Sequence, residues 1–205
     1  MKKLFLSIAL FISVLCVKAD EGMWLPYNLS GQSLAEMQQL GCKLTAEQIF
    51  NLNQPSLKDA IVQFGGGCTG ELISPEGLLL TNHHCGLSYV QTHATVEHDY
   101  LTDGFWAYSK AEELPNPGLT VSFLSYVEDV TDLALEGVSD EDTRSEVINN
   151  NIEKITKERK GDRDVTIEIV PFYSGNQYIM FEYDVYRDVR LVCCPPWITN
   201  RVTTR

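Results

Sequence analysis

The chain has 205 residues, and its 28 acidic residues outnumber 16 basic ones, which gives a formal net charge of −12. Such a surface repels phosphates, and no basic stripe with interleaved aromatic residues interrupts it, so we expect no nucleic-acid partner. The length suits one domain, or one lobe of a larger protein.

The first 19 residues have the three parts of a secretory signal peptide. Lys2 and Lys3 form a basic start, residues 4–17 form an apolar run, and small residues near Ala19 suit cleavage. The apolar run is shorter than the roughly 20 residues that a membrane span requires. We therefore expect cleavage after Ala19, export to the periplasm or cell surface, and no membrane insertion afterwards. Loss of the three lysines in the signal leaves a mature net charge of about −15.

Residues 20–60, at the start of the mature chain, are expected to form a helical segment. Two stretches, 33–36 and 45–48, match the helix capping box, in which Ser or Thr is followed three residues later by Glu or Gln. Ser56 is the expected cap of a third, short helix. We interpret these helices as packing elements.

From residue 61 the pattern changes to strands, and 61–196 is expected to form a β lobe, followed by a divergent tail at 197–205. Alternating apolar residues predict strands at 61–64, 119–130, 165–170 and 178–192. A turn at 174–176 joins the last two strands in a hairpin. A helix is predicted at 139–160, where three isoleucines recur on one face: Ile148, Ile152 and Ile155. No regular element is predicted after residue 192. The expected fold class is mainly β with flanking helices.

The segment 68–85, CTGELISPEGLLLTNHHC, is the most informative motif in the chain. It reads as a strand, a tight turn at 75–77, and a second strand that ends in Thr-Asn-His-His-Cys. Chymotrypsin-type proteases mount their general base in this way, on a histidine followed by a cysteine that can bridge back to the first strand. The cysteine pair with this geometric rationale is Cys68 and Cys85. An ordinary pair of histidines at a strand end is the alternative, and the combined features favour catalysis.

Of the two adjacent histidines, the sequence favours His84 as the base. Imidazole titrates near neutral pH and can take the proton of a serine hydroxyl. Neighbouring residues of a strand point to opposite sides, so His83 and His84 are not expected to face one cleft together. His83 is then interpreted as a packing or hydrogen-bonding residue.

The other members of a catalytic triad are not evident in the sequence. Three serines follow a Gly-x pattern but lack the second glycine: Ser33, Ser88 and Ser139. All three are expected to be structural, the first and last as helix caps and Ser88 because it is too close to His84 in sequence. Three carboxylates are candidates that the sequence does not separate: Asp99, Asp103 and Asp129. No complete triad can be assembled.

A zinc site is the rival use of the histidines and cysteines. Its ligands would come from six residues: Cys68, His83, His84, Cys85, His93 and His98. No Cys-x-x-Cys or His-Glu-x-x-His spacing occurs, and an oxidising compartment favours a disulfide over thiolates. We therefore expect no metal and no cofactor. Removal of the signal leaves five cysteines, so at least one of Cys42, Cys193 and Cys194 stays unpaired.

Several blocks of the sequence resemble one known family. They are DEGMWLP, GGCTGELISPEGLLLTNHHC, EHDYLTDGFWA, AEELPNPGLTVSFL and FYSGNQYIMFEYDVYRDVRLV. Together they cover about 20–192 and are similar to the N-terminal part of the bacterial dipeptidyl-peptidase 7/11 family. Its members are exported serine exopeptidases that remove dipeptides from peptide N-termini and commonly form homodimers. The resemblance implies the first barrel lobe of a chymotrypsin-like double β-barrel, incomplete in this chain.

Carried over by residue, the resemblance implies that His84 is the catalytic histidine and that Cys68 and Cys85 form a disulfide. The triad aspartate and serine of the family have no counterpart here, because the tail CCPPWITNRVTTR diverges from the family near Trp197. We expect an N-terminal piece shortened by a frameshift, without peptidase activity on its own. The alternative is a non-catalytic, peptide-binding remnant of the same fold.

Overall fold

The computed structural model describes residues 25–29 and 31–196. The predicted signal peptide and the tail at 197–205 lie outside the described residues. Two compact units divide between Ala46 and Glu47, inside the segment predicted to be helical. Each unit is described by itself below. No helix in the described ranges has the length and apolar character needed to cross a membrane.

The first unit is helical where it is described. It contains the 3₁₀ helix η1 (Pro26–Asn28) and helix α2 (Gln32–Gln39), and helix α3 (Ala46–Ile49) begins at its boundary. The capping box predicted at Ser33 is wrong. The residue that caps α2 is Gly31, with φ of +58°, a left-handed conformation that glycine adopts without a steric cost.

The second unit begins with the 3₁₀ helix η2 (Leu57–Ala60), whose predicted cap at Ser56 is confirmed. The backbone N–H of Ser56 donates to Oδ2 of Asp59, at 2.8 Å. The capping box formed by Ser56 and Asp59 holds the chain at the entry to the first strand.

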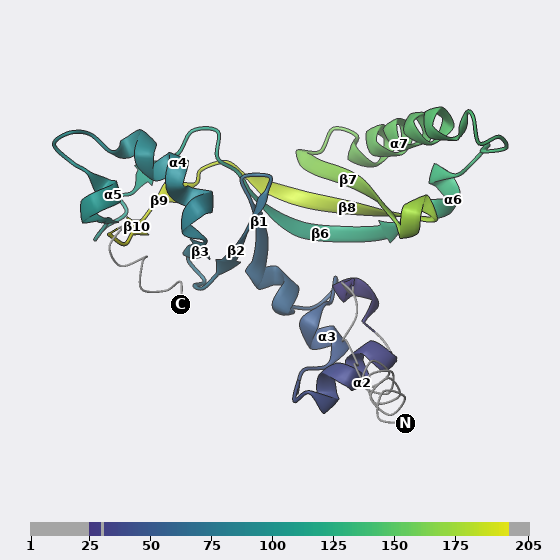
Figure 1. Ribbon diagram of the computed structural model, residues 1–205, viewed down its shortest axis with the longest axis horizontal. Helices are drawn as coiled ribbons and strands as arrows, with labels where there is room; N and C mark the ends of the chain where they lie inside the picture. Colours follow the sequence, from purple (N-terminus) through teal and green to yellow (C-terminus); the bar gives the residue numbers. More distant parts are fainter. Residues whose placement is uncertain (1–24, 30, 197–205) are drawn as a thin grey trace, which may run out of the picture. The chain divides into compact units, whose positions relative to one another are not determined.

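An antiparallel sheet of six strands forms the centre of the second unit, in the order β3-β2-β1-β6-β8-β7 (Figure 1). Its strands are β1 (Ile61–Phe64), β2 (Cys68–Leu72), β3 (Leu79–Thr81), β6 (Val121–Asp129), β7 (Val165–Phe172) and β8 (Gln177–Tyr186). The predicted β-hairpin is confirmed as β7 and β8, which pair from Val165–Asp184 to Phe172–Gln177. The fold is mainly β with helices, as the sequence predicts.

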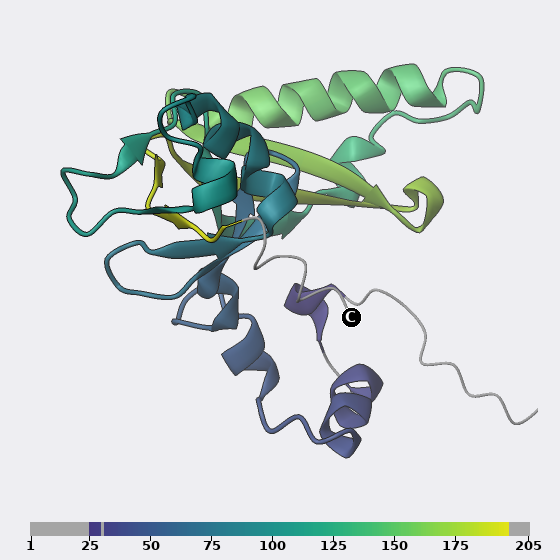
Figure 2. The ribbon, with the colours of Figure 1, turned by 60° about the vertical axis from the view of Figure 1, so that its left-hand side comes forward.

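One half of the sheet is covered by helix α7 (Arg144–Lys160), which runs along the β7–β8 hairpin (Figure 1 and Figure 2). The apolar face predicted for this helix is confirmed, because Ile148 and Ile155 are buried and Ile152 packs against them. The helix starts at Arg144, after the short helix α6 (Thr131–Ala134), so the cap predicted at Ser139 is wrong. This half has its own core, centred on Val130 and Met180.

The other half of the sheet carries the strands that precede the histidine motif. Val62, Phe64, Leu119 and Val121 form a second buried cluster on one of its faces. Gly70 of β2 is buried there, and a Cβ at this position would lie 2.8 Å from Cδ2 of Leu79 and 3.0 Å from the carbonyl oxygen of Leu80. Only glycine therefore allows β2 and β3 to pair this closely.

Two short strands near the end of the described chain each pair with a short strand from earlier in the sequence. Strand β10 (Cys193–Cys194) pairs with β4 (Phe105–Trp106), and β9 (Arg190–Leu191) pairs with β5 (Leu114–Pro115). The run predicted as one strand over 178–192 is therefore divided, since β8 ends at Tyr186. The prediction of no regular element after residue 192 is wrong for Cys193 and Cys194.

Candidate active site around His84

The histidine motif lies at the start of a helix. Strand β3 ends at Thr81, and helix α4 spans His83–His93 with Asn82 as its N-cap residue. The predicted strand through residues 81–85 is therefore wrong, and the strand-alternation argument for His84 does not apply. Successive helical residues are about 100° apart around the axis. The environments of the two histidines still differ, because His83 is half-buried and His84 is exposed.

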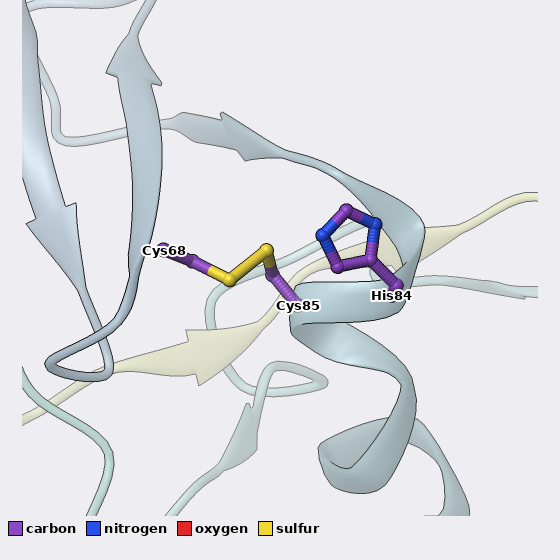
Figure 3. Close-up of side chains that lie close together, drawn as sticks. All are labelled: Cys68, His84 and Cys85. Atoms are coloured by element: carbon purple, nitrogen blue, oxygen red, sulfur yellow. A yellow bond between two sulfur atoms is a disulfide. The ribbon is translucent and has the colours of Figure 1, made fainter.

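The first turn of α4 is joined to strand β2 through two cysteines (Figure 3). The Sγ atoms of Cys68 and Cys85 lie 2.02 Å apart, at disulfide-bonding distance, and their Cα atoms are 6.1 Å apart. Both residues are half-buried against the cluster that contains Phe64 and Val121. One turn further along α4, the ring of Tyr89 meets Phe64 edge to face, at a centroid distance of 6.3 Å. Two contacts, the Cys68–Cys85 pair and the Tyr89–Phe64 ring contact, therefore hold the first turns of α4 against the sheet.

The imidazole of His84 lies beside the two sulfur atoms. A ring nitrogen of His84 and the two Sγ atoms are all within 4.8 Å of one another. Figure 3 shows a ring nitrogen on the side that faces Cys85. Among the described residues, no hydrogen bond or ion pair engages the His84 side chain, so the exposed ring can meet a reacting group from solvent.

The three candidate carboxylates are not joined to His84. Asp99 caps helix α5 (Tyr100–Asp103), where its Oδ1 accepts the N–H of Thr102 at 3.2 Å. Asp103 is an exposed residue at the end of the same short helix. Among the described residues, no hydrogen bond or ion pair joins either carboxylate to the imidazole of His84.

Asp129 has a structural role at the opposite end of strand β6. Its carboxylate accepts hydrogen bonds from the N–H of Thr131 at 3.0 Å and from Nε2 of Gln177 at 2.7 Å. A hydrogen bond from the Thr131 hydroxyl lowers the pKa of Asp129 most, and the bonds from Gln177 and from the Thr131 N–H lower it further. Strand geometry places it roughly 26 Å along β6 from Val121, which packs near the cysteine pair. That separation removes it as a partner for His84.

The three candidate serines are also dispersed. Ser88 follows His84 by one turn of α4, on the same exposed face, and its backbone oxygen accepts the Thr92 hydroxyl at 2.9 Å. Ser139 lies between α6 and α7, and Ser33 belongs to the other compact unit. Within the described residues, none of the three hydroxyls is hydrogen-bonded to His84, so no nucleophile and base pair is assembled.

The six residues weighed as zinc ligands do not converge on one point. Only Cys68, His84 and Cys85 come together within the described ranges. His93, at the other end of α4, has Nε2 at 2.9 Å from Oδ1 of Asn116, which is buried with 7% of its surface exposed. The sequence carries no local signal of this contact, because Asn116 and His93 are 23 residues apart.

Comparison with known proteins places the chain in a family. The profile of the family described as Peptidase S46 matches residues 19–199. The Asp/Glu-specific dipeptidyl-peptidase of Flavobacterium psychrophilum is 44% identical over 201 residues, which are 96% of this chain and 28% of that protein. The dipeptidyl-peptidase 7 of Porphyromonas endodontalis is also 44% identical, over 96% of this chain and 24% of its own length.

A solved structure has the same fold over the matched part. It is the crystal structure of Porphyromonas endodontalis DPP11 in complex with the dipeptide Arg-Glu, with a TM-score of 0.77 and 46% identity. The match covers 87% of this chain and 26% of DPP11. The chain thus spans about a quarter of the length of the curated relatives that it matches. The resemblance seen in the sequence blocks is confirmed, and the chain belongs to the Peptidase S46 family.

Proposed function

We propose that this chain carries the general base, His84, of a serine dipeptidyl-peptidase. The observation that carries the proposal is the position of His84 at the start of α4, exposed and beside the Cys68–Cys85 pair, in a chain of the Peptidase S46 family. In the reaction, a ring nitrogen takes the proton of a serine hydroxyl as that oxygen attacks the peptide carbonyl, and then donates it to the leaving amine.

We propose that the other catalytic groups lie in the part of the relatives that this chain does not match. The relatives are roughly four times longer, and no serine or carboxylate of the described chain is joined to His84. Without the serine nucleophile the covalent step cannot occur. The 205-residue chain alone is therefore expected to release no dipeptide.

The proposed substrates are peptides with a free N-terminus, from which a dipeptide is released. Relatives named Asp/Glu-specific dipeptidyl-peptidase and relatives named dipeptidyl-peptidase 7 match at the same 44% identity, so substrates with an acidic and with an apolar second residue should both be assayed. Export through the predicted signal peptide, oxidation of Cys68 and Cys85 to a disulfide after export, and a homodimeric enzyme complete the proposal.

A chimeric enzyme tests the role of His84. Residues 20–196 of this chain would replace the matching segment of the Flavobacterium psychrophilum enzyme, which supplies the rest of the protein. The readout is kcat/KM for dipeptide release from a fluorogenic substrate. With His84 intact we expect turnover, and His84→Ala should lower kcat by about 10⁴–10⁶-fold, as the loss of a triad member does in other serine proteases.

His98→Ala is the matched control, because His98 is another exposed histidine in the same unit. It should leave kcat within about threefold of the parent chimera, since an exposed substitution of this kind costs little stability. A folded chimera that is inactive with His84 present, or one that keeps its kcat after His84→Ala, contradicts the proposal. Circular dichroism of each variant separates loss of chemistry from loss of folding.

A further inference from the structure

Three residues spaced four apart attach one side of helix α4 to the second unit: Cys85, Tyr89 and His93. Residues at this spacing are neighbours on a helix surface, about 40° apart around the axis. Cys85 is joined to strand β2 and Tyr89 meets strand β1, through the contacts described above. His93, in the last turn, contacts Asn116. These three residues form a stripe along which α4 is held, and Figure 3 shows His84 next to Cys85, at the start of that stripe.

The contact of His93 with Asn116 is a hydrogen bond to a buried group. Nε2 of His93 lies 2.9 Å from Oδ1 of Asn116, which has 7% of its surface exposed. A carboxamide oxygen only accepts, so the ring N–H is the donor. The backbone of Asn116 is itself fixed, because its N–H donates to the carbonyl oxygen of Val189 at 2.9 Å and its carbonyl accepts the N–H of Leu119 at 3.1 Å. Leu119 belongs to the buried cluster that contains Phe64, and Val189 packs against it. The last turn of α4 is thus bonded to the core that its first turn packs on.

We propose that His93 and Asn116 are positioning residues for His84. His84 precedes Cys85 by one residue, so it projects about 100° around the axis from the start of the stripe, and the rotation of α4 sets its direction. Side chains extend about 5–6 Å from a helix axis, so a rotation of about 10° moves the imidazole by about 1 Å. A misplacement of that size lowers a reaction rate by up to about 100-fold.

The covalent link at Cys85 does not fix this rotation by itself. It attaches α4 at one point near the start of the helix, and the single bonds of a cysteine side chain let the helix turn and tilt about that point. The ring contact of Tyr89 is not directional in the way that a hydrogen bond is. His93 lies eight residues beyond Cys85, about 12 Å further along the axis, so its bond resists turning and tilting at the far end of the helix.

Two substitutions of His93 separate the hydrogen bond from the bulk of the ring. His93→Gln keeps an N–H donor near the end of the side chain, whereas His93→Leu fills similar space without a donor. In the 205-residue chain, carbon–proton correlation NMR follows the Cε1–Hε1 resonance of His84, which is assigned by its loss in His84→Ala. We expect this resonance to move in His93→Leu and to keep the parent position in His93→Gln. Gln91→Ala, at an exposed residue of the same last turn, is the control and should leave the resonance in place.

The chimera described above gives the catalytic readout, which rests on the proposed function of His84. His93→Leu should lower kcat by about 10–100-fold and leave KM within about threefold, because the bond orients the base and does not hold the substrate. His93→Gln and Gln91→Ala should keep kcat within about threefold of the parent. Asn116→Ala should match His93→Leu, and the double variant should lose no more than either single one, since both remove the same bond.

The two readouts separate failure of this inference from failure of the proposed function. An inactive parent chimera, or one that keeps its kcat after His84→Ala, contradicts the function of His84, and the NMR comparison then decides the positioning. A His84 resonance that does not move in His93→Leu would overturn the positioning role, and so would equal kcat in the Leu and Gln variants of an active chimera. Loss of the circular dichroism signal in His93→Leu would also overturn it, because the bond would then support the whole unit and not the direction of His84.

Discussion

Arg163 holds the buried carboxylate of Glu182 with both arms of its guanidinium. Nη1 donates to Oε1 at 2.5 Å and Nη2 donates to Oε2 at 2.7 Å. Only 8% of Glu182 is exposed, on strand β8, which lies between β6 and β7. The carboxylate in turn raises the pKa of Arg163, so this cation stays charged. Arg163 thus compensates the negative charge of Glu182, whose burial without a partner would cost free energy.

We expect Arg163→Ala to lower the free energy of unfolding more than the loss of a fully exposed pair does, because it leaves the Glu182 carboxylate buried without its partner. Arg187→Ala is the matched control. Arg187 pairs with Asp164 in a similar two-armed geometry, but both side chains are more than half exposed, so its loss should cost no more than about 1 kcal/mol. Urea denaturation of the two variants measures the difference. Equal losses would mean that burial of Glu182 does not govern the pair.

Acid stability should depend on Asp129, which ties the end of β6 to β8 and α6. The hydrogen bonds from Thr131 and Gln177 lower the pKa of its carboxyl in the folded chain. A depressed folded-state pKa gives stability that is fully present above the unfolded value of about 3.9 and is lost as the pH falls through the folded value. Asp129→Asn should therefore destabilise the chain at neutral pH and flatten the loss of stability between about pH 5 and pH 2.

Asp132→Asn is the control for this pH dependence. Asp132 is an exposed carboxylate three residues away, and no hydrogen bond or ion pair engages its side chain in the described chain. Unfolding free energies measured from pH 2 to 7 should follow the parent curve for this variant. If Asp129→Asn also follows the parent curve, its hydrogen bonds do not stabilise the folded state.

The parts of the fold that were predicted from sequence are those with a local pattern. The β7–β8 hairpin and the buried face of α7 repeat apolar residues at the spacing of their own element, and Ile148 and Ile155 lie where that spacing puts them. The start of α4 was missed because its cap residue, Asn82, makes no side-chain cap hydrogen bond. That helix is positioned by distant contacts of Cys85 and Tyr89 with the sheet, which no local pattern reports.

The candidate site, too, was predicted only where its residues are contiguous in the sequence. His84 was identified from a contiguous motif, although its predicted strand is a helix. A two-residue strand such as Cys193–Cys194 has no periodicity of its own and exists because it pairs with Phe105–Trp106, far away in the sequence. The partners of a catalytic histidine are likewise defined in space. The sequence therefore left Asp99, Asp103 and Asp129 unseparated, and only the contacts of each side chain distinguish them.

The adjacent cysteines of β10 should be slow to react. Burial raises the pKa of both thiols, and Cys194 also lies with its Sγ 3.5 Å from the carbonyl oxygen of Tyr100. Because the thiolate is the nucleophile, iodoacetamide should modify Cys193 and Cys194 slowly at pH 7, and faster as the pH rises above about 8.5. Mass spectrometry of the labelled peptides gives the rates. In urea both cysteines should react rapidly, and equal rates for the native and unfolded chain at pH 7 would contradict this burial.

Gly104, at the end of α5, provides a sharp test of how the last described residues pack. Its φ is +79°, and a Cβ there would lie 2.8 Å from the carbonyl oxygen of Cys194 and 2.9 Å from Cδ of Pro196. Gly104→Ala therefore combines an unfavourable backbone conformation with a clash, and should lower the free energy of unfolding by about 1–3 kcal/mol.

Gly67→Ala is the matched control for Gly104→Ala, because a Cβ at Gly67 would have no heavy atom within 4 Å and its backbone is outside the left-handed region. Its effect should stay within about 1 kcal/mol. Thermal and urea unfolding of both variants give the comparison. If Gly104→Ala were as mild as Gly67→Ala, the Cys194–Pro196 segment would not pack against α5. The strand pairing of Cys193–Cys194 with Phe105–Trp106 would then lose its support, because Gly104 is the residue that lets the two segments approach.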